Sequence, residues 1–222
     1  MDVAHELAAA GAGEGTLVWA ARQEQGRGRL GRTWASPEGG AYFSFILRPM
    51  RPATEIPQLS LVAGLAAAES IGELTGLAPS VRWPNDVLIG EKKVCGILTE
   101  ARHGAVVIGI GINVSTDPAH LPDPATSLKA VGAPACDPCR LTAALCRQFD
   151  QWYDVWTARG FDPIREALRP RMALFGQPVH LTAGSEHLEG TATDLDESGR
   201  LLVRLDSGLM RAFEMGEVTL LR

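Results

Sequence analysis

Residues 81–113 read VRWPNDVLIGEKKVCGILTEARHGAVVIGIGIN. Short apolar runs alternate here with turn residues, which is the pattern of an antiparallel meander. Pro84 and the pair His103-Gly104 mark two of the turns. Gly109 and Gly111 lie inside the last run, where glycine weakens a strand unless a ligand or another backbone packs closely on it. The expected strands are 81–83, 86–89, 94–101 and 105–113.

The segments on both sides extend this sheet and add helices. Two further strands are expected at 16–21 and 41–47. Asp2 is expected to cap the first helix and Gly11 to end it, and Pro170 is expected to bend or break the last one. The helices share apolar residues at helical spacing and are expected at 3–10, 56–74, 140–158 and 163–175.

After Gly176 the pattern changes to short alternating runs separated by turns. Five short strands in fewer than 50 residues predict a small β-barrel. We therefore expect an α+β protein with a catalytic domain over 1–175 and a barrel domain over 176–222. The catalytic domain should hold a mixed or antiparallel sheet with helices. The barrel strands are expected at 179–182, 189–195, 201–205, 210–214 and 218–221.

Composition limits the class of protein. Of 222 residues, 45% are hydrophobic and 21% are charged, as in a soluble globular chain. The net charge of −5 argues against a generally basic nucleic-acid binder. No apolar stretch is long enough to span a bilayer and no signal-peptide pattern is present, so we expect a cytoplasmic protein. Cys136 and Cys139 form a single C-x-x-C, which is weak evidence for zinc, and free thiols are favoured.

The segment QEQGRGRLGRTW at 23–34 carries the strongest chemical pattern. Three arginines alternate with three glycines, and they combine planar forks for phosphate or carboxylate with close backbone approach. Trp34 can stack on a flat ring. The segment suits a polyanion with a flat end, such as ATP. A flexible basic loop, or an arginine-rich strip that contacts RNA, remains an alternative because the segment matches no standard phosphate-loop motif.

Two further positions have both an ordinary and a functional interpretation. Asn85 and Asp86 follow Pro84 and could be simple turn residues. Lys93 stands at the start of an apolar strand, where most lysines are merely solvated. Residue type alone does not decide between these interpretations.

Taken together, the order and spacing of these segments resemble the biotin–protein ligase family. The resemblance covers nearly the whole chain, and Gly216-Glu217-Val218 resembles the end of the family's C-terminal domain. Five motifs carry the resemblance: Gly26-Arg27-Gly28-Arg29-x-Gly31-Arg32-x-Trp34, Trp83-Pro84-Asn85-Asp86, Lys93-x-x-Gly96-Ile97-Leu98-x-Glu100, Gly109-x-Gly111-x-Asn113 and Ala125-Thr126-Ser127-Leu128.

This resemblance implies a fold related to class II aminoacyl-tRNA synthetases, with helices on one face of the sheet. It implies that ATP, with Mg²⁺ on its phosphates, activates biotin as biotinyl-5′-AMP. The biotin is then passed to a lysine of a biotin carboxyl carrier protein or domain. The implied catalytic residues are Lys93, Arg29 and Asp86, where Asp86 would orient or deprotonate the acceptor lysine. The implied biotin contacts are Gln23, Gly26, Arg27, Arg29, Lys93 and Gly96. The implied nucleotide contacts are Arg29, Arg32, Trp34, Asn85, Lys93, Ile112 and Asn113.

Several features depart from the family pattern. In the family, a Ser-Thr pair that holds biotin's ureido ring lies at a position that would come just before Met1. The DNA-binding helix-turn-helix that some members carry at the N-terminus is absent from this sequence, so no DNA partner is expected. Ala21 replaces a common acidic residue, and Cys95 replaces an alanine. The resemblance is compatible with a homodimer. A lipoate- or octanoate-transferring enzyme on the same fold, and a non-enzymatic biotin-sensing regulator, remain alternatives.

Overall fold

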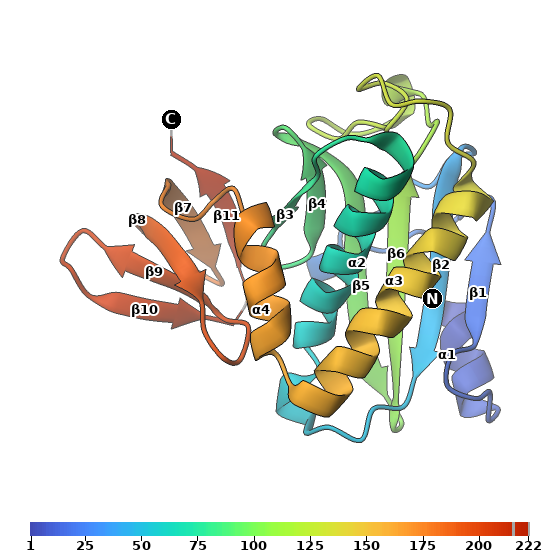
Figure 1. The fold of residues 1–222 in the computed structure, drawn as a ribbon, viewed down its shortest axis with the longest axis horizontal. Helices are drawn as coiled ribbons and strands as arrows, with labels where there is room; N and C mark the ends of the chain where they lie inside the picture. The colour runs from blue at the N-terminus through green and yellow to red at the C-terminus, as the bar shows by residue number, and fades with distance from the viewer. Residues whose placement is uncertain (215, 222) are drawn as a thin grey trace.

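The computed structural model describes residues 1–214 and 216–221, which form two antiparallel sheets and four α-helices (Figure 1). The larger sheet has the strand order β1-β2-β6-β5-β4-β3. The predicted α+β class is confirmed, but no part of this sheet is mixed, because every neighbouring pair of strands runs antiparallel. Its strands are β1 (Leu17–Ala20), β2 (Gly40–Leu47), β3 (Ser80–Arg82), β4 (Asp86–Ile89), β5 (Lys92–Arg102) and β6 (Ala105–Asn113).

The meander predicted at 81–113 forms the four neighbouring strands β3 to β6. β4 and β6 have the expected bounds, and β3 and β5 differ from prediction by one or two residues at their ends. The register pairs Asp86 with Gly96, and Gly96 with Gly111. These three residues therefore form a row across the neighbouring strands β4, β5 and β6, and directly opposed residues on neighbouring strands share one face of a sheet.

Three helices cover one face of this sheet: α2 (Gln58–Thr75), α3 (Pro138–Arg159) and α4 (Asp162–Leu168). α2 ends where Gly76 adopts a positive φ of 70°, which favours glycine. α3 begins at a cap in which the Arg140 N–H donates to the Asp137 carboxylate at 2.8 Å. The break expected near Pro170 is confirmed, because α4 ends at Leu168 and a short 3₁₀ turn follows it.

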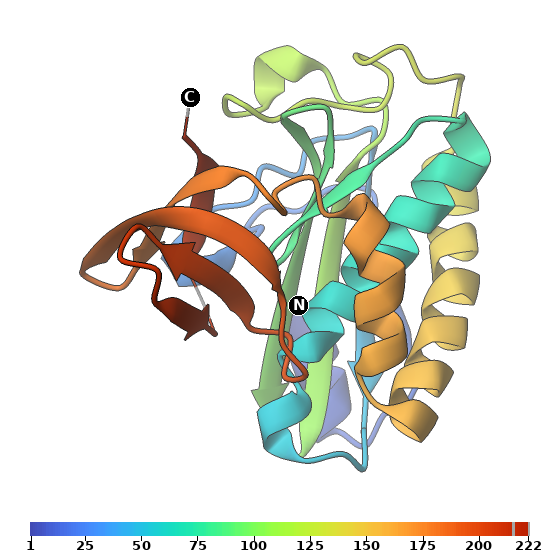
Figure 2. The ribbon, with the colours of Figure 1, turned by 60° about the vertical axis from the view of Figure 1, so that its left-hand side comes forward.

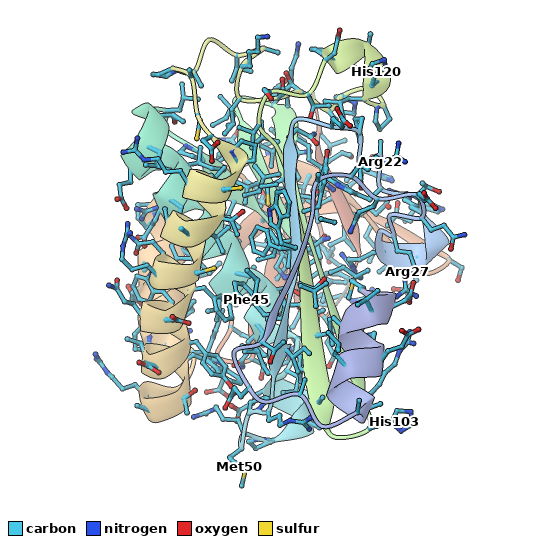
Figure 3. All side chains as sticks on the ribbon, turned by 90° about the vertical axis from the view of Figure 1, so that its right-hand side faces the viewer. Arg22, Arg27, Phe45, Met50, His103 and His120 are labelled. Carbon is cyan, nitrogen blue, oxygen red and sulfur yellow. The ribbon has the colours of Figure 1, made fainter. Side chains whose placement is uncertain are left out.

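α1 (Asp2–Ala9) lies on the opposite face, which corrects the expectation of helices on one face only (Figures 1 and 3). Ala4 and Ala8 pack there against Ile46, Ala105 and Val107. Side chains alternate between the two faces along a strand. Ile46, Ala105 and Val107 therefore point away from α2 and α3, and α1 shields them from solvent.

Asp2 does not cap α1 as expected. It lies inside the first turn, and no side-chain hydrogen bond caps the helix. Its carboxylate instead contacts the Arg27 guanidinium at 2.7 Å. Gly11 follows the helix with a φ of 93°, which agrees with its predicted place at the helix end.

The five strands predicted after Gly176 are confirmed and form one antiparallel sheet of order β10-β9-β8-β7-β11. Figure 2 shows this smaller sheet beside the end of the larger sheet that carries β3. The Trp83 indole N–H donates to the Gly199 carbonyl at 3.1 Å across this junction. Within the described residues, no helix is both long and apolar enough to cross a lipid bilayer. The strands are β7 (Pro178–Ala183), β8 (Glu186–Leu195), β9 (Leu201–Leu205), β10 (Met210–Phe213) and β11 (Glu217–Leu220).

Candidate active site

A cleft of about 670 Å³ lies over β4, β5 and β6, on the face of the larger sheet away from α2 and α3. The loop between β1 and β2 forms one wall of the cleft. The segment 121–125 forms another wall, and residues 216–219 of the smaller sheet reach its edge. The cleft thus gathers segments that are far apart in the sequence, as an active site between two domains does.

Three glycines form the floor of this cleft: Gly96, Gly109 and Gly111. A Cβ on Gly111 would lie 2.4 Å from the Trp34 Nε1, and one on Gly96 would lie 2.8 Å from the same indole. A Cβ on Gly109 would lie 2.6 Å from the Met1 sulfur. The groups that pack closely on Gly109 and Gly111 are thus the side chains of Met1 and Trp34, whereas the sequence analysis expected a ligand or another backbone.

The wall at 26–34 is folded rather than irregular. The Trp34 N–H donates to the Gly26 carbonyl at 2.9 Å, and Arg27 and Thr33 form an antiparallel bridge. The turn of the segment carries Leu30, which has a φ of 55° and is 72% exposed. The segment, called the arginine hairpin below, therefore has a fixed base beside the cleft and a tip in solvent.

Gln23 and Gly26 meet at the base of the arginine hairpin. The Ser36 hydroxyl donates to the Gln23 Oε1 at 2.7 Å. A Cβ on Gly26 would lie 2.2 Å from the Trp34 carbonyl and 2.7 Å from the Ser36 hydroxyl, so no larger residue fits there. Ser36 thus holds the Gln23 amide at the cleft. The sequence did not reveal this serine, because it lies 13 residues away from its partner.

Lys93 and Asp86 form an ion pair at 2.6 Å, and each side chain is about one quarter exposed. The Lys93 ammonium also lies 5.1 Å from the centroid of the Trp34 ring, within the range of a cation–π contact. Lys93 is therefore neither fully solvated nor unpaired. Its charge stands above the glycine floor, held between a carboxylate and an aromatic face.

Arg29 reaches the same end of the cleft. Its guanidinium donates to the Asn85 Oδ1 at 3.1 Å, while the Asn85 amide donates to the Ile97 carbonyl at 2.8 Å. Burial lowers the pKa of Arg29 from its usual value, and the nearby Asp86 carboxylate opposes that change. The Asn85 side chain therefore links the Arg29 guanidinium to the β5 backbone at this end of the cleft.

Arg32 points toward the smaller sheet, where its guanidinium pairs with the Glu217 carboxylate. Arg27 points the other way, toward the N-terminal end of α1 (Figure 3). Glu217 was not among the predicted site residues, and a contact between positions so far apart along the chain leaves no local pattern in the sequence.

Asn113 links two of the recognised motifs. Its buried amide donates to the Thr126 carbonyl at 3.0 Å, and the Thr126 N–H donates to the Lys93 carbonyl at 2.9 Å. The motif at 125–128 therefore connects the end of β6 to the start of β5. The Asn113 Oδ1 is buried and accepts no hydrogen bond from the residues that the structure describes, so it is free to receive a ligand donor.

Ile112, a predicted nucleotide contact, does not line the cleft. Its side chain is fully buried in the core on the helix side of the sheet. Residues alternate along β6, so Gly109, Gly111 and Asn113 face the cleft and Ile112 faces the helices. The same alternation was readable in the sequence.

The cysteines lie outside the cleft. Cys95 is buried in the helix-side core, and that burial raises the pKa of its thiol. Cys136 and Cys139 are free thiols. Among residues 1–214 and 216–221, no group of three His, Cys, Asp or Glu side chains is arranged to hold a metal ion.

The structure adds cleft residues that the sequence analysis had not assigned to the site. Ser44 is buried in β2 between Phe43 and Phe45, and it lines the cleft. A lone hydroxyl residue in an apolar strand is the signal that could have revealed it. Arg82, at the end of β3, also lines the cleft. It makes neither an ion pair nor a side-chain hydrogen bond with the part of the chain that the structure describes.

The sequence matches the model of the Biotin/lipoate A/B protein ligase family over residues 4–117. It matches that of the Biotin protein ligase C terminal domain over residues 174–221. A similar curated protein is the Bifunctional ligase/repressor BirA of Bacillus subtilis. It is 37% identical over 220 residues, which cover 95% of this chain and 68% of that protein.

A second relative, the Biotin--[acetyl-CoA-carboxylase] ligase of Paracoccus denitrificans, is 36% identical over 205 residues, covering 86% of this chain and 85% of that protein. Among solved structures, the Biotin protein ligase from Aquifex aeolicus in complex with biotin and ATP aligns with a TM-score of 0.88 and 34% identity. That alignment covers 98% of this chain and 94% of the other. The chain therefore belongs to the biotin protein ligase family.

Proposed function

We propose that this chain is an ATP-dependent biotin–protein ligase that forms biotinyl-5′-AMP and transfers biotin to a lysine of a biotin carboxyl carrier protein or domain. The observation that carries the proposal is the Lys93–Asp86 pair above the glycine floor, with Arg29 beside it. A flat floor accepts a ring system, and cations at one end accept a carboxylate and a phosphate chain.

The two substrates divide the cleft. Gln23, the backbone at Gly26 and Arg27, and the floor of the cleft at Gly96 contact biotin. Arg29, Arg32, Asn85 and Asn113 contact the nucleotide. The Trp34 indole covers the glycine floor between the biotin and nucleotide sites. A ring of the bound ligand either replaces the indole there or stacks against it. The unfilled Asn113 Oδ1 supports the nucleotide assignment, because it can accept a hydrogen bond from a ribose or base.

In the first step, a biotin carboxylate oxygen attacks the α-phosphorus of ATP, and pyrophosphate leaves with the electron pair of the broken bond. Two anions must approach each other, so neutralisation by nearby cations is the main requirement. Lys93 and Arg29 supply that charge. Their present partners, Asp86 and Asn85, hold both cations at the cleft before a substrate arrives.

In the second step, the acceptor lysine amine attacks the carbonyl of the mixed anhydride, and AMP leaves. The amine must lose a proton, and Asp86 is the carboxylate nearest to Lys93. When a phosphate takes over Lys93, Asp86 becomes free to accept a hydrogen bond from the incoming amine. Asp86 therefore orients the acceptor during transfer.

Mg²⁺ enters this reaction on the phosphates of ATP. A magnesium ion commonly binds through one or two carboxylates and the substrate phosphates, and keeps several waters. The described residues contain no preformed cluster of three ligands, and Asp86 is one of the cleft carboxylates that could supply a ligand to such an ion. This donor set suits an ion that arrives with its nucleotide.

Further parts of the same proposal are a catalytic domain over 1–175, a C-terminal domain over 176–222, a cytoplasmic location and no DNA partner. The match over 174–221 supports the division, and the net charge of −5 supports the last point. Titration with a short DNA duplex tests it. Sedimentation with and without biotinyl-5′-AMP decides between a monomer and a homodimer.

The test is ATP–pyrophosphate exchange with biotin, with lipoate, and with neither. Biotin-dependent exchange, followed by labelling of one lysine on a carrier domain, is the expected result. Exchange that depends on lipoate instead would move the chain to the lipoate-attaching enzymes. Biotin binding without exchange would favour a biotin-sensing regulator.

A further inference from the structure

We propose that Glu100 is a positioning residue that fixes the base of the arginine hairpin by holding the guanidinium of Arg27. Neither side chain needs to touch a substrate for this role. The part of the inference that concerns catalysis rests on the proposed ligase function, and the part that concerns the hairpin does not.

Glu100 stands near the end of β5, on the same face as the glycine floor, and it is about one fifth exposed. A single carboxylate oxygen, Oε2, lies 2.8 Å from the His5 Nε2, 3.0 Å from the Arg102 Nη2 and 3.5 Å from the Arg27 Nη2. These three groups come from α1, from β5 and from the arginine hairpin. Glu100 therefore joins the hairpin to both elements beneath it.

Arg27 is held from two sides. Its Nη2 also lies 2.7 Å from the Asp2 carboxylate, at the start of α1. Its backbone bridges Thr33 inside the hairpin, next to Gly26 and Trp34. Fixing the side chain therefore fixes the backbone that carries the cleft wall. This explains why an arginine stands at a position whose backbone, and not its side chain, is expected to meet biotin.

An ordinary surface ion pair would not have this effect. The Arg147–Glu73 pair between α3 and α2 is such a pair, because both side chains are about half exposed and both helices are already fixed by the core. Glu100 is less exposed, gathers three basic groups and holds a segment whose tip is in solvent. Networks of this kind contribute more than isolated exposed pairs.

Limited trypsin digestion of the ligand-free protein tests the inference, because trypsin cuts after arginine and the hairpin carries three. We expect Glu100→Gln to speed cleavage after Arg29 and Arg32 by roughly five- to tenfold, as the loss of about 1–1.4 kcal/mol would do. Cleavage elsewhere and the melting temperature should stay close to wild type. The matched control, Glu73→Gln, should leave hairpin cleavage unchanged.

A double-mutant cycle separates positioning from general loosening. Arg27→Gln should speed cleavage after Arg29 and Arg32 at least as much as Glu100→Gln, because it also removes the pair with Asp2, and the double variant should be no faster than Arg27→Gln alone. Additive effects would overturn the inference. So would unchanged cleavage in Glu100→Gln, or faster cleavage throughout the chain with a lower melting temperature.

Kinetics connect the same variant to the reaction. Glu100→Gln should raise the KM for biotin in pyrophosphate exchange several-fold while kcat changes less, and Glu100→Asp should recover part of the loss. A large fall in kcat with an unchanged KM would contradict the positioning role. If the wild-type protein shows no biotin-dependent exchange at all, the ligase proposal fails, while the digestion result still decides what Glu100 does.

Discussion

Lys93→Ala should slow adenylate formation by about two orders of magnitude without unfolding the protein. Lys93 and Asp86 are 2.6 Å apart and each about one quarter exposed. At an effective dielectric constant of about 20, unit charges at this distance attract by about 6 kcal/mol, before desolvation offsets much of it. Removing one preorganised charge from such a site typically costs about 3 kcal/mol in the transition state. That loss corresponds to roughly 150-fold in rate.

The assay is biotin-dependent ATP–pyrophosphate exchange at saturating ATP, together with thermal melting. Lys92→Ala is the matched control, because Lys92 is the preceding residue on β5, is exposed, and does not line the cleft. It should exchange at the wild-type rate. If Lys93→Ala exchanges within about threefold of wild type while melting normally, Lys93 does not neutralise the reacting anions, and the charge argument fails.

Three further outcomes are expected. Gly111→Ala places a methyl group 2.4 Å from the Trp34 Nε1, so the indole must shift by about 1 Å, and such overpacking costs about 1–3 kcal/mol. Titration calorimetry should therefore find that the variant binds both biotin and ATP more weakly than the wild-type protein does. Asp86→Asn should slow transfer from isolated biotinyl-5′-AMP to a carrier more than it slows exchange, and an equal effect on both steps would contradict the acceptor-orienting role. Burial raises the pKa of Asp194, but hydrogen bonds and the charge of Arg169 lower it more, so the net pKa is below 3.8. The ionised carboxylate therefore stabilises the fold above about pH 4. In denaturant titrations, Asp194→Asn should be less stable than the wild-type protein near pH 7, and the difference should vanish as the pH falls below 3.8.

Local patterns were enough to predict most of the secondary structure. The strand at 105–113 has the predicted bounds, because His103-Gly104 makes the turn before it and its apolar run ends at Asn113. The helix at 140–158 begins two residues early, because Asp137 caps it. The side of the sheet on which the first helix packs could not be predicted, since a short alanine-rich helix fits either face.

The sequence indicated which residues line the cleft better than it indicated the contacts between them. The pattern of glycines and arginines identified the arginine hairpin, but not that Arg32 meets Glu217 or that Arg27 meets Asp2 and Glu100. Ion pairs between distant segments depend on the folded geometry and leave no periodic trace in a single sequence. The direction of the Ile112 side chain is a different case, because strand alternation in the sequence already indicated that it faces the helices.

The ion pairs of the cleft also set how binding should respond to salt. Two of the basic side chains proposed to meet the reacting anions are already matched by carboxylates of the same chain: Lys93 by Asp86, and Arg32 by Glu217. An incoming polyanion displaces these tethered carboxylates rather than free counterions. Bare cations would form new ion pairs with the nucleotide, and dissolved salt screens such pairs, so affinity would fall with ionic strength. Built-in counterions flatten that dependence, so nucleotide affinity should change little between dilute buffer and physiological salt.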